Sequence, residues 1–336
     1  KLGSVQEYEI NASGGNQRSS FYSSFAYHKN EGVFYGIDFE KFTFRVNADH
    51  KLGEKLEAGA RINAAYTKAN DVPMQSLYYS NPLFAGSMIL PWTQPYNEEG
   101  DHNIDIPENA NTNPRATAKY DDQWEKQYRV NGNFYLEWKP LKYLTIKTTN
   151  AIEGTFGEGR RYWHPYTNEG SATLQTSRLQ YLQATTSNTI TYNNIFADKH
   201  SLRVLVGQEA MKRTYSSMYL YSPDVDPNIP YPNTSSSKDD EGSYSTNERT
   251  LLSFFAIADY SFDSRYFLQA SVRYDGSSLF GKNNQWGVFY SVGASWNMNN
   301  EKFLENADFL DLLKIRASYG VNGNDNISPY QAYGVY

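Results

Sequence analysis

The chain has 336 residues, a formal net charge of −6, no cysteine and a mean hydropathy of −0.69. No apolar run reaches the length of about 18 residues that a transmembrane helix needs, and the absence of cysteine excludes disulfides and thiolate metal ligands. The chain has no run of basic residues, so nucleic acid is not an expected partner.

Segments in which apolar and polar residues alternate recur along the whole chain, and this period of two predicts β-strands. The clearest predicted strands lie at 42–48, 56–66, 128–138, 266–274, 286–298 and 313–319. Weaker alternation marks further strands near 5–13, 20–28, 143–156, 178–192, 200–212 and 250–262, which gives about twelve strands in all.

The connections between these strands alternate between short and long. Short turns are predicted at 14–19, 53–55, 140–142, 197–200 and 263–265, and long polar segments at 29–40, 67–124, 157–177, 213–248 and 276–284. Outer-membrane barrels show this asymmetry, with short periplasmic turns and long extracellular loops. A helical turn is expected within 299–311.

The strand at 286–298 carries the most informative pattern. Its apolar side begins at Trp286 and includes Trp296, ten residues further on, with Val292 between them. At about 3.3 Å per residue and a tilt of about 40°, the two rings lie roughly 25 Å apart, which is the height of an outer-membrane apolar band. Trp286 and Trp296 are therefore predicted to be membrane-girdle residues, and even-numbered residues in 266–274 and 286–298 to face lipid.

These patterns predict an all-β fold, an antiparallel transmembrane β-barrel of outer-membrane type. Tyrosine, with 29 residues, suits both strands and membrane interfaces. A barrel of this kind lies in the outer membrane of a Gram-negative bacterium and contacts its lipid. A soluble sandwich strand also alternates, but it is usually shorter.

No catalytic constellation is present, so we do not expect an enzyme. Neither a His-Glu-x-x-His pattern nor a Gly-x-Ser-x-Gly elbow occurs. No metal site or cofactor is expected, although loop carboxylates at Asp224 and Asp226, or at Asp239 to Glu241, could touch Ca²⁺. A solvated loop is the alternative interpretation of these acidic residues.

Aromatic residues in the predicted loops are the candidates for contact with a substrate or partner. Rigid rings of this kind stack on sugars or clasp peptides at low entropic cost. They could equally pack the loops on each other, and the sequence leaves both possibilities open. The candidates are Trp92, Tyr96, Tyr162, Trp163, Tyr166, Tyr219 and Tyr221.

Ordered motifs give the chain a specific resemblance. Residues 250–324 contain Arg273-Tyr274-Asp275-Gly276-Ser277-Ser278, then Trp286-Gly287, and later Leu313 to Gly320 followed by Gly323-Asn324. With Glu7-Tyr8, Ser13-Gly14-Gly15 and Arg45-Val46-Asn47 near the start, this pattern resembles the SusC/RagA family of TonB-dependent outer-membrane transporters. The resemblance spans nearly the whole chain and is weakest in the long loops.

The resemblance implies a barrel of about 22 strands filled by an N-terminal plug, which is preceded by a segment that contacts TonB. We therefore expect residues 1–336 to be a partial barrel wall, with the plug and the C-terminal strands absent from this chain. The N-terminus has no signal-peptide pattern, which fits a mature or internal piece. The implied function is TonB-dependent uptake of oligosaccharides or peptides, with a SusD-like surface lipoprotein as partner.

Charged residues on the polar sides of the strands are predicted to line the lumen. Most are expected to pair across the wall or with the plug, and a minority to line a substrate route. The main candidates are Arg45, Arg61, Arg129, Arg273, Asp275 and Arg316. The alternative functions are a self-contained outer-membrane pore or enzyme, and a secreted all-β binding module.

Overall fold

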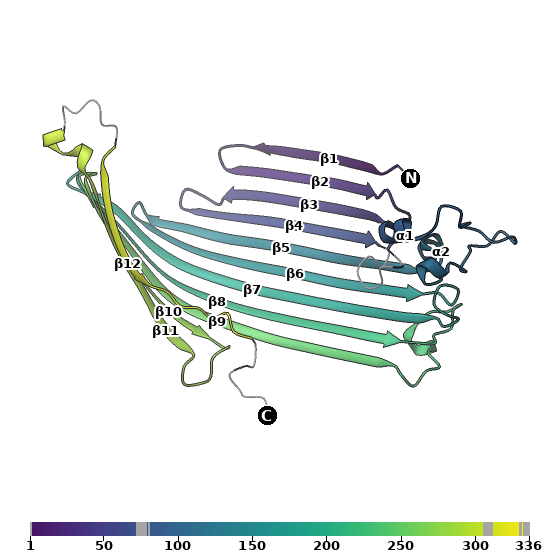
Figure 1. The fold of residues 1–336 in the computed structure, drawn as a ribbon. Helices are drawn as coiled ribbons and strands as arrows, with labels where there is room; N and C mark the ends of the chain where they lie inside the picture. Colours follow the sequence, from purple (N-terminus) through teal and green to yellow (C-terminus); the bar gives the residue numbers. More distant parts are fainter. Residues whose placement is uncertain (1, 72–78, 80, 305–311, 329–330, 332–336) are drawn as a thin grey trace.

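The computed structural model describes residues 2–71, 79, 81–304, 312–328 and 331, and its main element is one twelve-stranded sheet. The strands are β1 (Ser4–Gly15), β2 (Ser19–Glu31), β3 (Asp38–Lys51), β4 (Leu56–Asn70), β5 (Asp122–Leu141), β6 (Leu144–Trp163), β7 (Thr173–Phe196), β8 (His200–Ser222), β9 (Glu241–Phe262), β10 (Tyr266–Ser277), β11 (Trp286–Asn297) and β12 (Lys314–Val321). Each strand pairs antiparallel with the next in sequence, so β1 and β12 form the two edges of a curved sheet (Figure 1). The prediction of an antiparallel sheet of about twelve strands is confirmed.

The helical elements are short and lie in the connections. They are α1 (Pro82–Met88), α2 (Pro114–Tyr120) and the 3₁₀ turns η2 (Pro107–Asn109), η3 (Pro232–Thr234), η4 (Met298–Asn300) and η5 (Lys302–Leu304). Among the residues described, none of the helices is long and apolar enough to cross a membrane. The helical turn predicted within 299–311 begins as η4 and η5, and residues 305–311 lie outside the described part.

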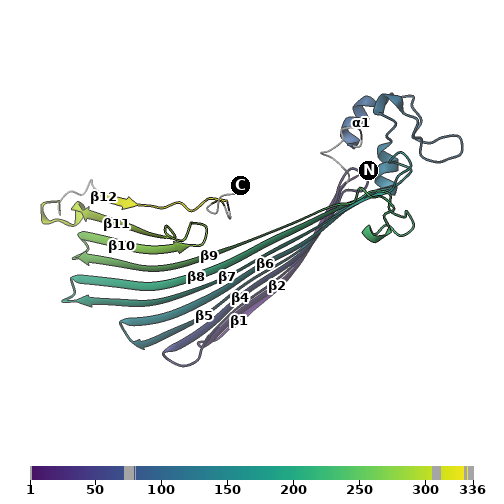
Figure 2. The same ribbon diagram turned by 90° about the horizontal axis from the view of Figure 1, so that it is seen from below.

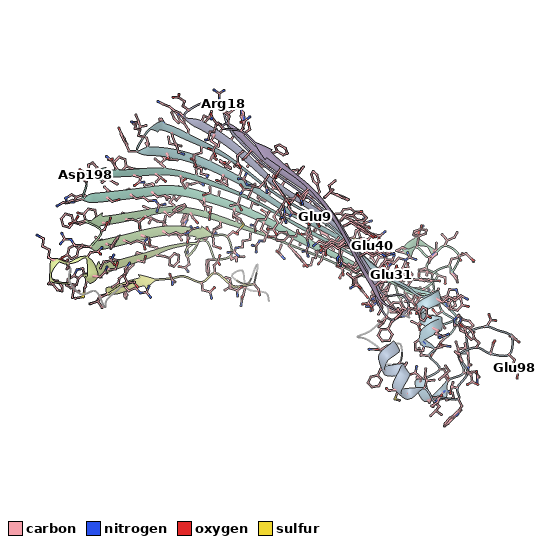
Figure 3. All side chains as sticks on the ribbon, turned by 90° about the horizontal axis from the view of Figure 1, so that it is seen from above. Glu9, Arg18, Glu31, Glu40, Glu98 and Asp198 are labelled. Carbon is pink, nitrogen blue, oxygen red and sulfur yellow. The ribbon has the colours of Figure 1, made fainter. Side chains whose placement is uncertain are left out.

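The two ends of the sheet differ as predicted. Arg18 and Asp198 mark short turns at one end, whereas Glu31 and Glu98 lie toward the other end (Figure 3). The β7–β8 turn places Ala197 and Asp198 at φ 47° and 57°, the pair of positive φ angles that a tight hairpin turn requires. Both helices, α1 and α2, gather at the end with the long connections (Figure 2).

The register gives the sheet one apolar and one polar face. On the apolar face Tyr8, Tyr27, Phe42, Tyr66 and Tyr128 form one cross-strand row near the long connections, with neighbouring ring centroids 4.8–6.4 Å apart. Such rows of aromatic rings are the girdles expected at membrane interfaces.

The two tryptophans of β11 lie at opposite ends of the apolar face. Trp286 stacks on Tyr274 with centroids 4.6 Å apart, and Trp296 stacks on Tyr266 at 6.1 Å. Between them Val292 is 46% exposed on the same face and pairs with Ala270 of β10. The spacing of the two tryptophans in the sequence therefore correctly predicted that both lie on the apolar face of the sheet and that they mark its two ends.

The strands on either side of two predicted loops extend further than the sequence predicted. β6 continues to Trp163, β7 begins at Thr173, β8 continues to Ser222 and β9 begins at Glu241. The predicted loops 157–177 and 213–248 were therefore wrong in extent, and the connections are 164–172 and 223–240. Backbone pairing continues into these ends, but apolar and polar residues no longer alternate strictly there, so the sequence pattern that marks a strand is lost before the strand ends.

The connection between β4 and β5 forms a small folded unit of its own. Ile106, Ala85 and Ala116 are almost fully buried in it. The Asn113 amide donates to the carbonyls of Pro95 (3.0 Å) and Asn103 (2.8 Å), and its oxygen accepts from the N–H of Arg115 at the start of α2. These bonds satisfy backbone groups that would otherwise be buried without partners.

Candidate functional site

A polar groove lies where the polar face reaches the end with the long connections. It has a volume of about 570 Å³ and crosses β5, β6, β7 and β8. One cross-strand row, Glu125, Gly159, Ser177 and Tyr219, runs across it. A Cβ at Gly159 would lie only 2.5 Å from the Ser177 hydroxyl oxygen. Glycine at this position therefore leaves space for the groove above the backbone of β6.

Side chains around the groove combine amides, charges and rings. The Arg161 Nε donates to the Gln123 side-chain oxygen at 3.1 Å, and its guanidinium lies 5.5 Å from the centre of the Trp163 ring. Tyr219 is 38% exposed and can offer its ring to a ligand. Aromatic faces beside fixed amide and guanidinium groups suit recognition of sugars or peptides.

The predicted aromatic candidates divide into three groups. Trp163 and Tyr221 lie on strands instead of the predicted loops, on the same face as Tyr219; Tyr221 shares a row with Gln175 and Arg161. This location corrects the prediction that they are loop residues, because the strands extend beyond the apolar band.

Tyr162 is the second case, because it points to the opposite side of β6. It is only 6% exposed and packs with Ala172, Leu174 and Val225. Its position favours the packing interpretation over ligand contact. The cluster anchors the β6–β7 connection beside the β8–β9 connection.

The remaining aromatics belong to the connections. The Tyr96 ring lies 5.1 Å from the His102 ring, and the Tyr166 hydroxyl donates to the His102 carbonyl. Tyr120 then contacts His102, Tyr166 and His164, with centroids 5.2–5.6 Å apart. These rings hold the β4–β5 and β6–β7 connections together.

The Trp92 side chain, in contrast, does not take part in this packing. It is 72% exposed, and Met88 and Leu90 beside it are each 40% exposed. These three residues, hereafter the apolar tip, give the β4–β5 connection an apolar surface that projects from a well-packed base. Exposed aromatics on rigid supports are typical anchors of protein interfaces.

The junction of the two connections contains a partly buried carboxyl group that sequence reasoning missed. Asp121 accepts hydrogen bonds from the His164 N–H (3.0 Å) and from the Thr167 hydroxyl. Burial raises the pKa of Asp121 to about 6, and these two hydrogen bonds oppose the rise. The sequence does not indicate which of the adjacent residues Asp121 and Asp122 is the less exposed, because both have the same side chain.

We expect the stability of this junction to fall as the pH rises. The folded-state pKa of Asp121 exceeds its ordinary value of 3.8, so ionisation between about pH 4 and pH 6 penalises the closed junction. The penalty reaches at most roughly 3 kcal/mol. Hydrogen exchange of the His164 amide in the full-length protein, corrected for intrinsic rates, should show less protection at pH 7.5 than at pH 4.5. Asp121→Asn should remove this dependence, and an unchanged pH profile in that variant would contradict the assignment.

The predicted lumen charges all lie on the polar face, but only some are paired. Arg61 lies 2.8 Å from Asp49, whose carboxylate also accepts from the Tyr135 hydroxyl at 2.6 Å. Arg273 contacts Asp275 at 2.6 Å and Glu209 at 3.1 Å. Arg45, Arg129 and Arg316 have no ion-pair partner within the described residues.

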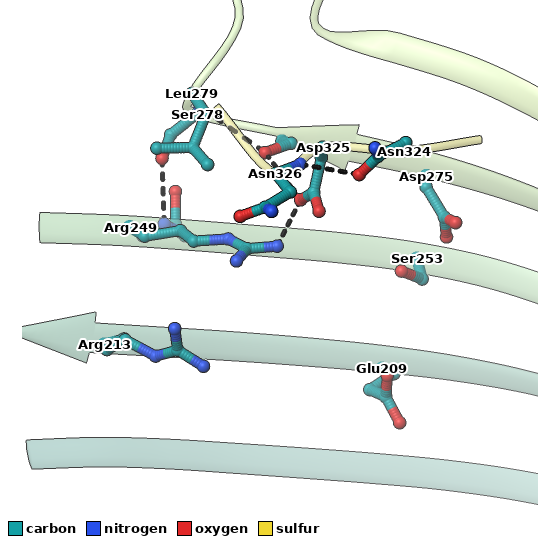
Figure 4. A network of polar contacts seen from close by, with 12 residues as sticks. Glu209, Arg213, Arg249, Ser253, Asp275, Ser278, Leu279, Asn324, Asp325 and Asn326 are labelled. Atoms are coloured by element: carbon teal, nitrogen blue, oxygen red, sulfur yellow. Dashed lines mark hydrogen bonds and ion pairs between the residues drawn. The ribbon is translucent and has the colours of Figure 1, made fainter. Parts of the chain in front are cut away.

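The chain after β12 folds over the same polar face. Asp325 forms an ion pair with Arg249 of β9 and accepts from the Ser277 hydroxyl at 3.4 Å (Figure 4). Ile315 and Tyr319 lie on the apolar face, so a continued strand would have carried Asp325 to that face as well. Folding inward instead places the carboxylate beside a cation.

Two of the acidic residues considered for Ca²⁺ accept hydrogen bonds within and between the connections. Asp224 accepts from the Ser171 hydroxyl at 2.6 Å, and Asp226 accepts from the Asn228 N–H at 2.8 Å. The described residues contain no group of three or more His, Cys, Asp or Glu side chains placed to hold a metal ion.

Comparisons with known proteins agree with this geometry. Residues 77–334 match the family model described as TonB dependent receptor-like, beta-barrel. TonB-dependent receptor P26 of Formosa agariphila is 27% identical over 344 residues, which cover 98% of this chain and 34% of that relative. TonB-dependent receptor SusC of Bacteroides thetaiotaomicron is 38% identical over 94 residues, 28% of this chain and 9% of SusC.

A solved structure has the same sheet. The RagAB peptide importer in its open-open state superposes with a TM-score of 0.84 at 24% identity, and the match covers 97% of this chain and 37% of that one. The chain thus spans about a third of the length of the curated relatives that match along its whole length. It belongs to the TonB dependent receptor-like β-barrel family of the Gram-negative outer membrane, and its twelve strands form part of the wall of such a barrel.

Proposed function

We propose that the intact protein imports oligosaccharides or peptides across the outer membrane, with energy supplied through TonB. The polar groove at the end with the long connections is the observation that carries this proposal. In a barrel of this family that end is extracellular. The groove lies on the same face as the lumen charges, so a ligand bound there is already at the entrance of the passage.

The groove chemistry supports either substrate class. Tyr219 in the groove and Trp163 beside it offer rings, while Gln123 and Arg161 offer hydrogen-bonding groups to hydroxyls, amides or carboxylates. Membership of the receptor family favours import over a secreted binding module or a self-contained pore or enzyme. The plug that TonB would pull is outside these residues, so transport requires the intact protein.

We also propose that a SusD-like surface lipoprotein docks on the extracellular connections. The apolar tip supports this, because it exposes large apolar groups on a base that His102 and Tyr120 hold rigid. A pocket of about 260 Å³ between this connection and Tyr35 of the β2–β3 connection lies nearby. Arg115 borders this pocket, with its guanidinium 5.8 Å from the centre of the Tyr35 ring.

Substrate uptake by full-length variants tests the groove. Tyr219→Ala should reduce substrate affinity about three- to tenfold, the cost of losing one aromatic stacking contact. Tyr244→Ala is the matched control, because Tyr244 is 69% exposed on the opposite face of the neighbouring strand β9. Uptake and binding would be measured with panels of oligosaccharides and peptides. Equal effects of the two substitutions, or no effect of either, would argue against the groove as the capture site.

A further inference from the structure

A row of polar side chains crosses the lumen face below the polar groove, from β3 to β6. The strand register places four residues side by side, hereafter the lumen row: Arg45, Asn63, Asn131 and Glu153. All four line a depression of about 300 Å³. On β5, Asn131 follows Glu125 of the groove by six residues, which places it about 15 Å further into the barrel. A ligand that moves inward from the groove therefore meets this row.

The side chains of the lumen row are available to a ligand. Within the described residues, none of these four side chains makes a hydrogen bond or an ion pair. Arg61 also lines the depression, but it lies 2.8 Å from Asp49 and is already paired. Arg129 lies in the next row toward the long connections, outside the depression, and is not within ion-pair distance of Glu153. The lumen row thus presents a guanidinium, two carboxamides and a carboxylate to the lumen.

The order and spacing of these groups match those of a free peptide. Three strand spacings, about 14 Å, separate the Cα atoms of Arg45 and Glu153. Side chains stand roughly perpendicular to a sheet, which keeps the two charged groups at a similar separation. An extended tripeptide spans about 10 Å, and an ion-pair contact of about 3 Å at each end accounts for the remainder.

We propose that the lumen row binds a short peptide with free termini, and this inference rests on import as the proposed function. Glu153 binds the terminal ammonium group, and Arg45 binds the terminal carboxylate. Asn63 and Asn131 lie between them and pair with the peptide amides, because a carboxamide both donates and accepts hydrogen bonds. A neutral oligosaccharide has no charged ends and leaves Arg45 and Glu153 without partners. The lumen row therefore favours peptides as the imported class.

Equilibrium binding of radiolabelled trialanine to the full-length transporter in detergent tests the proposal. Arg45→Gln and Glu153→Gln should each weaken binding about tenfold, because each removes a charge-assisted hydrogen bond. Asn131→Leu keeps the approximate size of the side chain and should weaken binding about three- to tenfold through the loss of amide contacts. Lys41→Gln is the matched control, since Lys41 lies on the same face of β3 outside the depression, and it should bind as wild type does. Heat-modifiable gel migration would confirm that each variant is folded.

Peptides with one blocked end test the orientation. N-acetyl-trialanine should bind wild type about tenfold more weakly than trialanine, and Glu153→Gln should cause no further loss with this peptide. Trialanine amide should show the same relation to Arg45→Gln. Losses of the same size with free and blocked peptides would contradict the assignment of the two ends. Trialanine binding that is unchanged in all three lumen-row variants would overturn the site and leave the plug as the partner of these side chains.

Substrate import separates the failure of this inference from the failure of the proposed function. Import of oligosaccharides without binding of trialanine would overturn the peptide site and leave the proposed function intact. Import of neither class would overturn both. A neutral trisaccharide such as cellotriose should bind wild type, Arg45→Gln and Glu153→Gln alike. Equal losses for cellotriose and trialanine in these variants would show a polar site without a preference for peptides.

Discussion

Replacing Val292 with arginine in the full-length protein should destabilise the barrel by roughly 2–4 kcal/mol, whereas arginine at Ser291 should cost far less. Val292 lies on the apolar face between the two girdle tryptophans and is 46% exposed, so its replacement meets hydrocarbon near the midplane. Ser291 lies on the polar face, where its hydroxyl is 2.7 Å from that of Ser271. Losing that exposed hydrogen bond is a small effect.

Reversible unfolding by guanidinium in lipid vesicles would measure both costs. Val292→Met serves as a control for side-chain size, because methionine is long and flexible but carries no charge. Similar destabilisation by arginine at Ser291 and at Val292 would contradict the assignment of the two faces.

The second large effect concerns the β4–β5 connection. Deleting residues 82–118 from the full-length transporter should leave the barrel inserted, because β4 ends at Asn70 and β5 begins at Asp122. Lipoprotein capture and growth on the cognate substrate should be abolished or strongly reduced. The deletion removes the apolar tip and the packed unit that supports it, and both contribute to the proposed docking surface.

Pull-down of the lipoprotein and growth would be measured together, with folding checked by heat-modifiable migration. Trp92→Ser tests the apolar tip with the rest of the connection in place. Tyr231→Ser is its control, since Tyr231 is 59% exposed in the β8–β9 connection. Normal capture and normal growth after the deletion would show that this connection serves neither partner nor substrate.

The faces and ends of the sheet could be predicted because hydrocarbon imposes a simple rule on each strand. Trp286, Val292 and Trp296 follow a strict period of two, and the structure places all three on one face. The resemblance of the sequence motifs identified the protein family. The alternation of apolar and polar residues does not specify a family by itself. The twelve-strand count followed from alternation and from the turns between the strands.

The site was less predictable because it lies beyond the apolar band. There hydrocarbon no longer imposes strict alternation on the strands, so Tyr219 and Tyr221 look like loop residues in the sequence. Nothing local distinguishes the buried Tyr162 from the neighbouring Trp163, whose ring lies near Arg161 on the groove side. The spacing Gly157-x-Gly159 was the one available signal for the groove floor, since glycine in a strand often marks a close approach.

Spin-label accessibility along β11 tests the central claim that this sheet is a membrane barrel wall. Labels would be placed singly at 287–295 of the full-length protein in lipid vesicles. Collision with oxygen, which concentrates in hydrocarbon, should peak at the even positions 288, 290, 292 and 294, and fall at the odd positions. A profile without this period of two, or one with oxygen maxima at the odd positions, would contradict the account.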